Sequence, residues 1–138
     1  MISDLARISL GDGARMAAID VFPGREVLSP IRDARVTKAR VLSRNVSSRH
    51  DAIGLLMDTG STLFGSPDQK VAVCVNKTIR FRPLGDITIG DVLRGEVAGM
   101  PITIKVSGIV ANPKETRLVG FRLDHDKNFV AEGVLCRS

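Results

Sequence analysis

The chain has few of the side chains on which many active sites and nucleic-acid interfaces depend. It contains no tryptophan or tyrosine and only five phenylalanines, which leaves little surface on which bases could stack. Two histidines and two cysteines are too few for a histidine metal cluster or a cysteine-rich zinc site. No cofactor-binding motif is visible either, so we expect neither a metal nor a cofactor.

Long hydrophobic runs are also missing. No segment offers the roughly 18 apolar residues of a membrane span. The first residues lack the charged region followed by an apolar run that defines a signal peptide. We therefore expect no membrane partner and a location in the cytoplasm or in a virion.

Turn-forming residues are abundant instead. Thirteen glycines and six prolines are spread along the 138 residues and divide the chain into short segments. The segments between them, such as 35–43, 52–57 and 102–110, are typical of strands, and none predicts a helix of ten or more residues. The length suits one domain that buries roughly two thirds of its unfolded surface. The sequence predicts a single all-β domain spanning residues 1–138.

A repeat with an offset of 66 residues indicates how this domain is built. Residues 53–58 (Ile-Gly-Leu-Leu-Met-Asp) return as residues 119–124 (Val-Gly-Phe-Arg-Leu-Asp), and residues 20–24 return as residues 86–90. Two separate segments that share one offset predict two similar halves of about 65 residues each, too few repeats for a solenoid. We place the halves at about 1–67 and 68–138.

Several segments resemble the sequence blocks of the Hint superfamily, which contains inteins and Hedgehog autoprocessing domains. Residues 19–28 are similar to a block with a P-G-D-x-V turn, and residues 60–71 to a block that ends T-P-D-H-x-V. Residues 84–93 resemble A-x-D-L-x-x-G-D-x-V, and residues 127–138 resemble H-N-F-x-A-N-G-I-L-V-H-N. The resemblance covers the whole chain. It implies an all-β fold made of two pseudo-symmetric halves, which the repeat indicates independently.

The residues that Hint domains use for self-processing are replaced here. The family uses a first Cys or Ser as nucleophile, a Thr and a His that act on the preceding peptide bond, and a terminal His-Asn pair. The corresponding positions of this chain are Met1, Ser66, Gln69, Gly120, Lys127, Arg137 and Ser138. A thioether has no proton to lose, a glutamine amide cannot carry a proton near pH 7, and serine has no amide with which to cyclise. We also expect no scissile peptide bond before Met1 or after Ser138.

We therefore expect a non-catalytic Hint-fold module that serves a structural or interaction role. Because Hint-like domains occur in bacteria and their phages, a component of a phage particle or of a bacterial assembly fits this expectation. The partner would be another protein or further copies of the chain. An intein-like autoprocessing domain remains the alternative.

A basic stretch is the second candidate site. The net charge is +5, and six cationic residues share one span with a single acidic residue, Asp33: Arg32, Arg35, Lys38, Arg40, Arg44 and Arg49. We expect this strand to present a positive face to an acidic partner. Alternatively, the cationic residues bind the phosphates of a nucleic acid, or they are solvent-exposed and protect an edge strand from pairing with other strands. Its counterpart, residues 101–110, carries only Lys105, and we expect an apolar surface from the exposed members of Ile102, Ile104, Val106 and Ile109.

Two smaller motifs leave alternatives open. Residues 55–61 contain the hydrophobic-D-T-G-S motif of aspartic proteases, whose chemistry needs two carboxylates that share one proton. The repeat mate of Asp58 is Asp124, followed by His125-Asp126, so a protease would need a homodimer to supply two copies of Asp58; a plain turn is the alternative. For the cysteines, we expect Cys74 to lie in strand core and leave Cys136 open.

Overall fold

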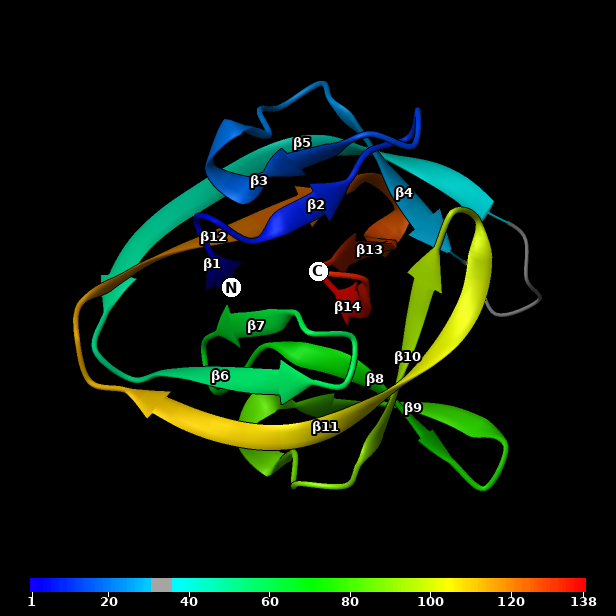
Figure 1. Cartoon of the computed structure of the whole chain (residues 1–138). Coiled ribbons are helices and arrows are strands. Elements are labelled where there is room, and N and C mark those ends of the chain that lie inside the picture. Colours follow the sequence, from blue (N-terminus) through cyan, green and yellow to red (C-terminus); the bar gives the residue numbers. More distant parts are fainter. Residues whose placement is uncertain (31–35) are drawn as a thin grey trace.

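Strands form nearly all the regular structure of residues 1–30 and 36–138, which the computed structural model describes (Figure 1). The elements are β1 (Ile2–Ser3), β2 (Arg7–Ser9), β3 (Arg15–Ala17), η1 (Ala18–Asp20), β4 (Glu26–Pro30), β5 (Val36–Arg49), β6 (Ala52–Met57), β7 (Thr62–Gly65), β8 (Lys70–Val75), β9 (Thr78–Pro83), η2 (Leu84–Asp86), β10 (Val92–Val97), β11 (Met100–Asn112), β12 (Thr116–Leu123), η3 (Asp124–Asp126), β13 (Asn128–Ala131) and β14 (Val134–Arg137). The prediction of an all-β fold is confirmed. In the described part of the chain, no helix is long and apolar enough to cross a membrane.

The 66-residue repeat of the sequence is also a repeat of structural elements. The 3-10 turn η1 begins at Ala18 and η2 at Leu84, and β4 begins at Glu26 and β10 at Val92. The turns before β4 and β10 make matching backbone bonds, because Gly24 N donates to Val41 O and Gly90 N donates to Val106 O, each over 2.8 Å. Both glycines have φ above +90°, a conformation that side chains disfavour.

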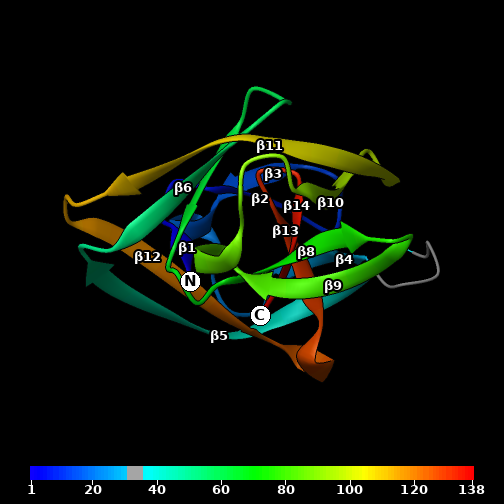
Figure 2. The same ribbon diagram turned by 90° about the horizontal axis from the view of Figure 1, so that it is seen from below.

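The two long strands tie these repeated units into one body. The first part of β5 pairs with β4, and its remainder crosses to pair with β12 from the later part of the chain. In the same way, β11 pairs first with β10 and then with β6 from the earlier part. Figures 1 and 2 show β5 and β11 on opposite sides of the molecule. Because each long strand bridges both units, neither unit has a complete core of its own.

Each crossing point is held by an aspartate from the opposite repeat. The Asp58 carboxylate accepts a hydrogen bond from Lys105 N (3.1 Å), close to the irregularity between Val106 and Gly108 in the β11–β6 ladder. Asp124 accepts the equivalent bond from Arg40 N (2.8 Å) in β5. An irregular ladder leaves a backbone N–H without a strand partner, and the carboxylate supplies the acceptor.

The core runs along the inner faces of both repeats and includes Phe129, which packs edge-to-face on Phe121. The expectation of an apolar outer surface on residues 101–110 is wrong for two of its members, since Ile104 and Val106 are fully buried. They pair across the sheet with strands of both repeats, so their side chains fill the core. Ile109 is exposed, and Ile102 is only partly buried against the core.

The two cysteines differ in their surroundings. Cys136 is fully buried, whereas Cys74, which we expected in the core, is only half-buried near the end of β8. Burial raises the pKa of the Cys136 thiol to about 12 because the charged thiolate would lose its hydration. Cys136 is therefore a neutral packing residue at physiological pH.

Gly95 lies where neighbouring atoms leave no room for a side chain, and it yields a test of the fold. A Cβ added at Gly95 would lie 2.5 Å from Gly133 O and 2.5 Å from Ile104 Cδ1. We expect Gly95→Ala to lower the free energy of unfolding by about 1–3 kcal/mol, as overpacking does. Urea denaturation measures this change. Gly108→Ala is the matched control, because its Cβ would first meet Leu56 Cβ at 3.5 Å, an ordinary contact. Equal stability of the two variants would contradict the packing described here.

Candidate functional site

The first and last strands place both ends of the described chain at one location (Figures 1 and 2). Ile2 in β1 pairs with Val119 of β12 on one side and with Gly65 of β7 on the other. Cys136 in β14 pairs with Val71 of β8. The segment that joins β7 to β8 therefore runs between the two ends, and it carries Ser66 and Gln69.

The backbone of Met1 is held by both of these side chains. Met1 N donates to Gln69 Oε1 (2.7 Å) and to Ser66 Oγ (3.1 Å). Met1 O accepts from Ser66 N (2.9 Å) and from Ser66 Oγ (3.2 Å). Ser66 is fully buried, and burial lowers the pKa of the Met1 α-amino group because the charged form loses solvation.

Gln69 also reaches the other end of the chain. Its Nε2 donates to Arg137 O (2.9 Å) and to Lys70 O (3.0 Å), while its Oε1 accepts from Met1 N. Both amide hydrogens and the amide oxygen of Gln69 therefore form hydrogen bonds, and the residue is only 6% exposed. The side chain is a bridge between Met1 and Arg137, and we call this arrangement the Gln69 bridge.

A pocket of about 340 Å³ opens beside the Gln69 bridge. Its lining includes Met1, Gln69, Gly120 and Ser138, together with Asn45. Gly120 leaves room for the Met1 side chain, since a Cβ there would lie 3.3 Å from Met1 Cγ. Ser138 Oγ donates to Lys127 O (2.9 Å). All seven positions that the resemblance singled out therefore lie at or next to one site.

Apart from the Met1 α-amino group, whose pKa burial lowers, the pocket lacks groups that exchange protons near neutral pH. Its lining contains no His, Cys, Asp or Glu, and its charged side chains are Arg44 and Arg122. Arginine stays protonated throughout the physiological range. Asn45 lines the pocket because β5 pairs with β12 so that Asn45 lies opposite Gly120, and no sequence motif marks this residue. In the described part of the chain, no group of three or more His, Cys, Asp or Glu is placed to hold a metal ion.

The basic stretch is only partly available at the surface. Arg32 and Arg35 lie outside the described residues. Arg44 donates to Ile19 O, and its guanidinium carbon lies 4.0 Å from the centre of the Phe22 ring.

Arg49 is paired with carboxylates. Its guanidinium binds Asp51 (2.8 and 2.9 Å) and approaches Asp68 (3.7 Å). Lys38 and Arg40 are exposed. The positive face expected from the sequence therefore narrows, among the described residues, to Lys38 and Arg40.

The D-T-G-S segment forms a turn between β6 and β7. Asp58 binds the backbone of β11 exactly as its repeat mate Asp124 binds the backbone of β5. The same contact in both repeats gives Asp58 a structural role that needs no second carboxylate.

No model of a known protein family matches this sequence, and no curated protein matches it. Solved structures do match over nearly the whole chain. The TvoVMA intein has a TM-score of 0.86 at 15% identity, covering 98% of this chain and 95% of its own. A DnaB intein from Synechocystis sp. PCC 6803 has a TM-score of 0.86 at 14% identity, covering 99% of this chain and 96% of its own.

A bacterial intein-like domain from Clostridium thermocellum has a TM-score of 0.79 at 20% identity and covers all of this chain and 99% of its own. At identities of this size, similarity concerns the course of the backbone. The backbone of this chain thus follows nearly the same course as those of intein structures. The chain has an intein-like Hint fold.

Proposed function

We propose that this chain is a non-catalytic Hint-fold module that has lost protein self-processing and serves a structural or interaction role. The observation that carries the proposal is the Gln69 bridge. It occupies the place where the resemblance expects a proton-transferring histidine, next to the first residue of the domain. A primary amide holds its partners by hydrogen bonds but neither gains nor loses a proton near neutral pH.

The groups around the bridge support the same conclusion. Self-processing begins when a hydroxyl or thiol at the first position attacks the preceding carbonyl. The thioether of Met1 offers no such nucleophile. Cys136, the nearest thiol in sequence to the last residues, is fully buried, and its raised pKa of about 12 keeps it protonated.

Exposed cationic and large apolar side chains support an interaction role. Lys38 and Arg40 are exposed on β5, and several large apolar side chains are exposed elsewhere, among them Leu5, Ile89 and Met100. We infer that the module binds another protein or further copies of itself as part of a larger assembly, such as a phage particle or a bacterial complex, in the cytoplasm or in a virion. Lys38 and Arg40 would meet an acidic surface through long-range attraction.

Residual autoprocessing is the second candidate function, and one observation favours it. The Ser66 hydroxyl lies within hydrogen-bond distance of both Met1 N and Met1 O, at 3.1 and 3.2 Å. A hydroxyl in this position can polarise the peptide bond before Met1 when a preceding segment is attached. It cannot replace the missing nucleophile.

The first test asks whether the domain cuts its flanks. With unrelated peptides fused before Met1 and after Ser138, we expect the fusion protein to stay intact during prolonged incubation, with or without added thiol. Mass spectrometry measures the outcome, and a self-splicing intein in the same fusion serves as the positive control. Cleavage at either junction would overturn the proposed loss of self-processing.

The second test concerns the structural role of Gln69. Gln69→Leu removes the side-chain donor to Arg137 O and leaves Met1 N with Ser66 Oγ as its remaining side-chain acceptor, so we expect the free energy of unfolding to fall by about 1–3 kcal/mol. Urea denaturation measures the loss. Asn45→Leu makes the same amide-to-apolar change at an exposed position of the same pocket, and we expect a change of about 0.5 kcal/mol or less. Equal effects would show that the bridge is not a stabilising tether.

A further inference from the structure

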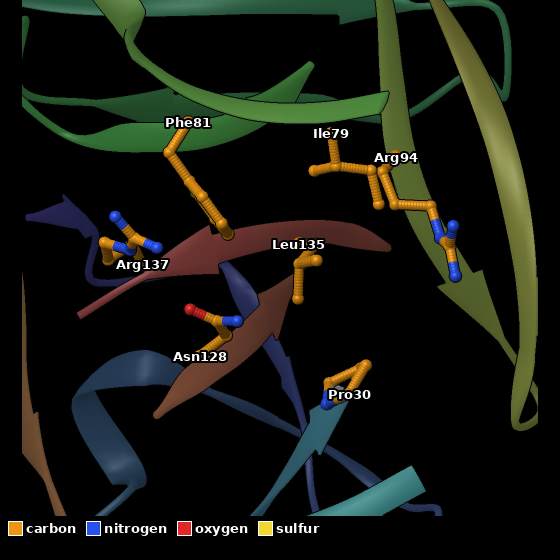
Figure 3. A pocket seen from close by; sticks show the side chains of 7 residues that line it. All are labelled: Pro30, Ile79, Phe81, Arg94, Asn128, Leu135 and Arg137. Carbon is orange, nitrogen blue, oxygen red and sulfur yellow. The ribbon is translucent and has the colours of Figure 1, made fainter. Parts of the chain in front are cut away.

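A second pocket, of about 360 Å³, lies where five strands meet (Figure 3). Its walls come from β4, β9, β10, β13 and β14. The lining residues are Pro30, Ile79, Phe81, Arg94, Asn128, Leu135 and Arg137. We call it the arginine pocket.

The arginine pocket is apolar in the middle and positive at both ends. Figure 3 shows Leu135 near its centre, with Arg94 and Arg137 at opposite ends and their guanidinium groups pointing apart. The Arg137 guanidinium carbon lies 4.0 Å from the centre of the Phe81 ring. Among the side chains that the structure describes, which exclude Asp126, no carboxylate forms an ion pair with Arg94 or Arg137, and the lining contains no acidic residue.

A neighbouring hollow of about 530 Å³ extends the positive surface. It shares Ile79 and Arg94 with the arginine pocket and adds Lys77 and Cys74, again without an acidic residue. Three cations therefore follow one another along this surface, from Arg137 through Arg94 to Lys77. Three neighbouring cations attract an anionic ligand from solution. Their charged hydrogen bonds to that ligand are strongest where the pocket excludes water.

We propose that the arginine pocket binds an extended acidic segment of a partner protein. An apolar side chain of the segment packs on Leu135 and Phe81, and carboxylates on either side bind Arg94 and Arg137. This proposal deepens the interaction role proposed above and rests on it. It does not depend on the loss of self-processing, because the pocket shares no lining residue with the pocket beside the Gln69 bridge.

Strand register sets the spacing of the carboxylates. Gly95 pairs with Val134, so Arg94 lies opposite Leu135 and two residues from Arg137 along β14, or about 7 Å at strand rise. Figure 3 shows Leu135 between the two arginines, so a ligand that contacts all three needs an apolar position between two acidic ones. In an extended peptide, positions i, i+2 and i+4 share one face and span about 13 Å. The matching pattern is acidic-x-apolar-x-acidic.

Two features favour a peptide over a nucleic acid. β9 pairs only with β8 among the described strands, so an extended segment can add main-chain hydrogen bonds along its other edge. The pocket offers a single aromatic ring, Phe81, and the Arg137 guanidinium already stacks on it. Binding of single-stranded nucleic acid relies on several such rings.

Fluorescence anisotropy with a labelled peptide tests the ligand pattern. The probe is Glu-Ser-Leu-Ser-Glu-amide with a fluorophore on its N-terminus, and we expect saturable binding that weakens as salt is added. Replacing both glutamates by glutamine, or the central leucine by serine, should weaken binding about tenfold, as expected when charged hydrogen bonds or apolar burial are lost. Failure of the probe to bind, or equal binding of the three peptides, would overturn the proposal.

Variants of the protein locate the binding. We expect Arg94→Gln and Arg137→Gln each to weaken binding of the probe about tenfold. Arg80→Gln removes the same charge from an exposed position of β9 outside the lining, and we expect binding within about twofold of the unchanged protein. An equal loss of affinity in all three variants would mean that binding depends only on the net charge of the protein, and it would contradict a specific pocket. Tighter binding of oligothymidine than of the peptide, lost in the same two pocket variants, would also overturn it.

Discussion

The Gln69 bridge is the interaction on which the arrangement of the candidate site depends. One side-chain amide accepts from Met1 N and donates to Arg137 O, so residues 136 positions apart in sequence share a single partner. β1 has only two residues and depends on such fixing to keep its place between β7 and β12. The group that holds the ends together is also one that cannot transfer a proton, and this links the structural role to the proposed loss of chemistry.

The exchange of strands between repeats explains why the ends meet where they do. Because β5 and β11 each pair with a strand of the other repeat, the two repeats enclose one core, and β1 and β14 lie beside the segment that connects them. Asp58 and Asp124 stabilise the two crossings by identical backbone contacts. A fold closed in this way keeps its ends together whether or not the site between them is reactive, so the scaffold can persist after its chemistry is lost.

The sequence predicted the repeat and the all-β fold, because the spacing of turn residues and the 66-residue offset can be read directly from the chain. The resemblance named the seven candidate positions, and the structure places them at or next to one site. The sequence did not predict which side chains become buried or paired. Ile104 and Val106 look like their exposed neighbours until β11 pairs with β10 and β6, and Arg44 looks free until Phe22 approaches from a distant segment. Arg49 pairs mainly with Asp51, two residues away, a contact that the charge pattern did not single out. The arginine pocket was missed for the same reason, since its lining comes from five strands with no shared sequence motif.

The central claim is that Gln69 acts as a fixed hydrogen-bonded bridge between the chain ends. Hydrogen exchange of side-chain amides, followed by NMR, tests it most directly, because a bridging amide is shielded from solvent while an exposed one is not. The Gln69 Nε2 hydrogens should exchange at least about tenfold more slowly than the side-chain amide hydrogens of exposed Asn45. Exchange of the Gln69 amide as fast as that of Asn45 would contradict the bridge and the account built on it.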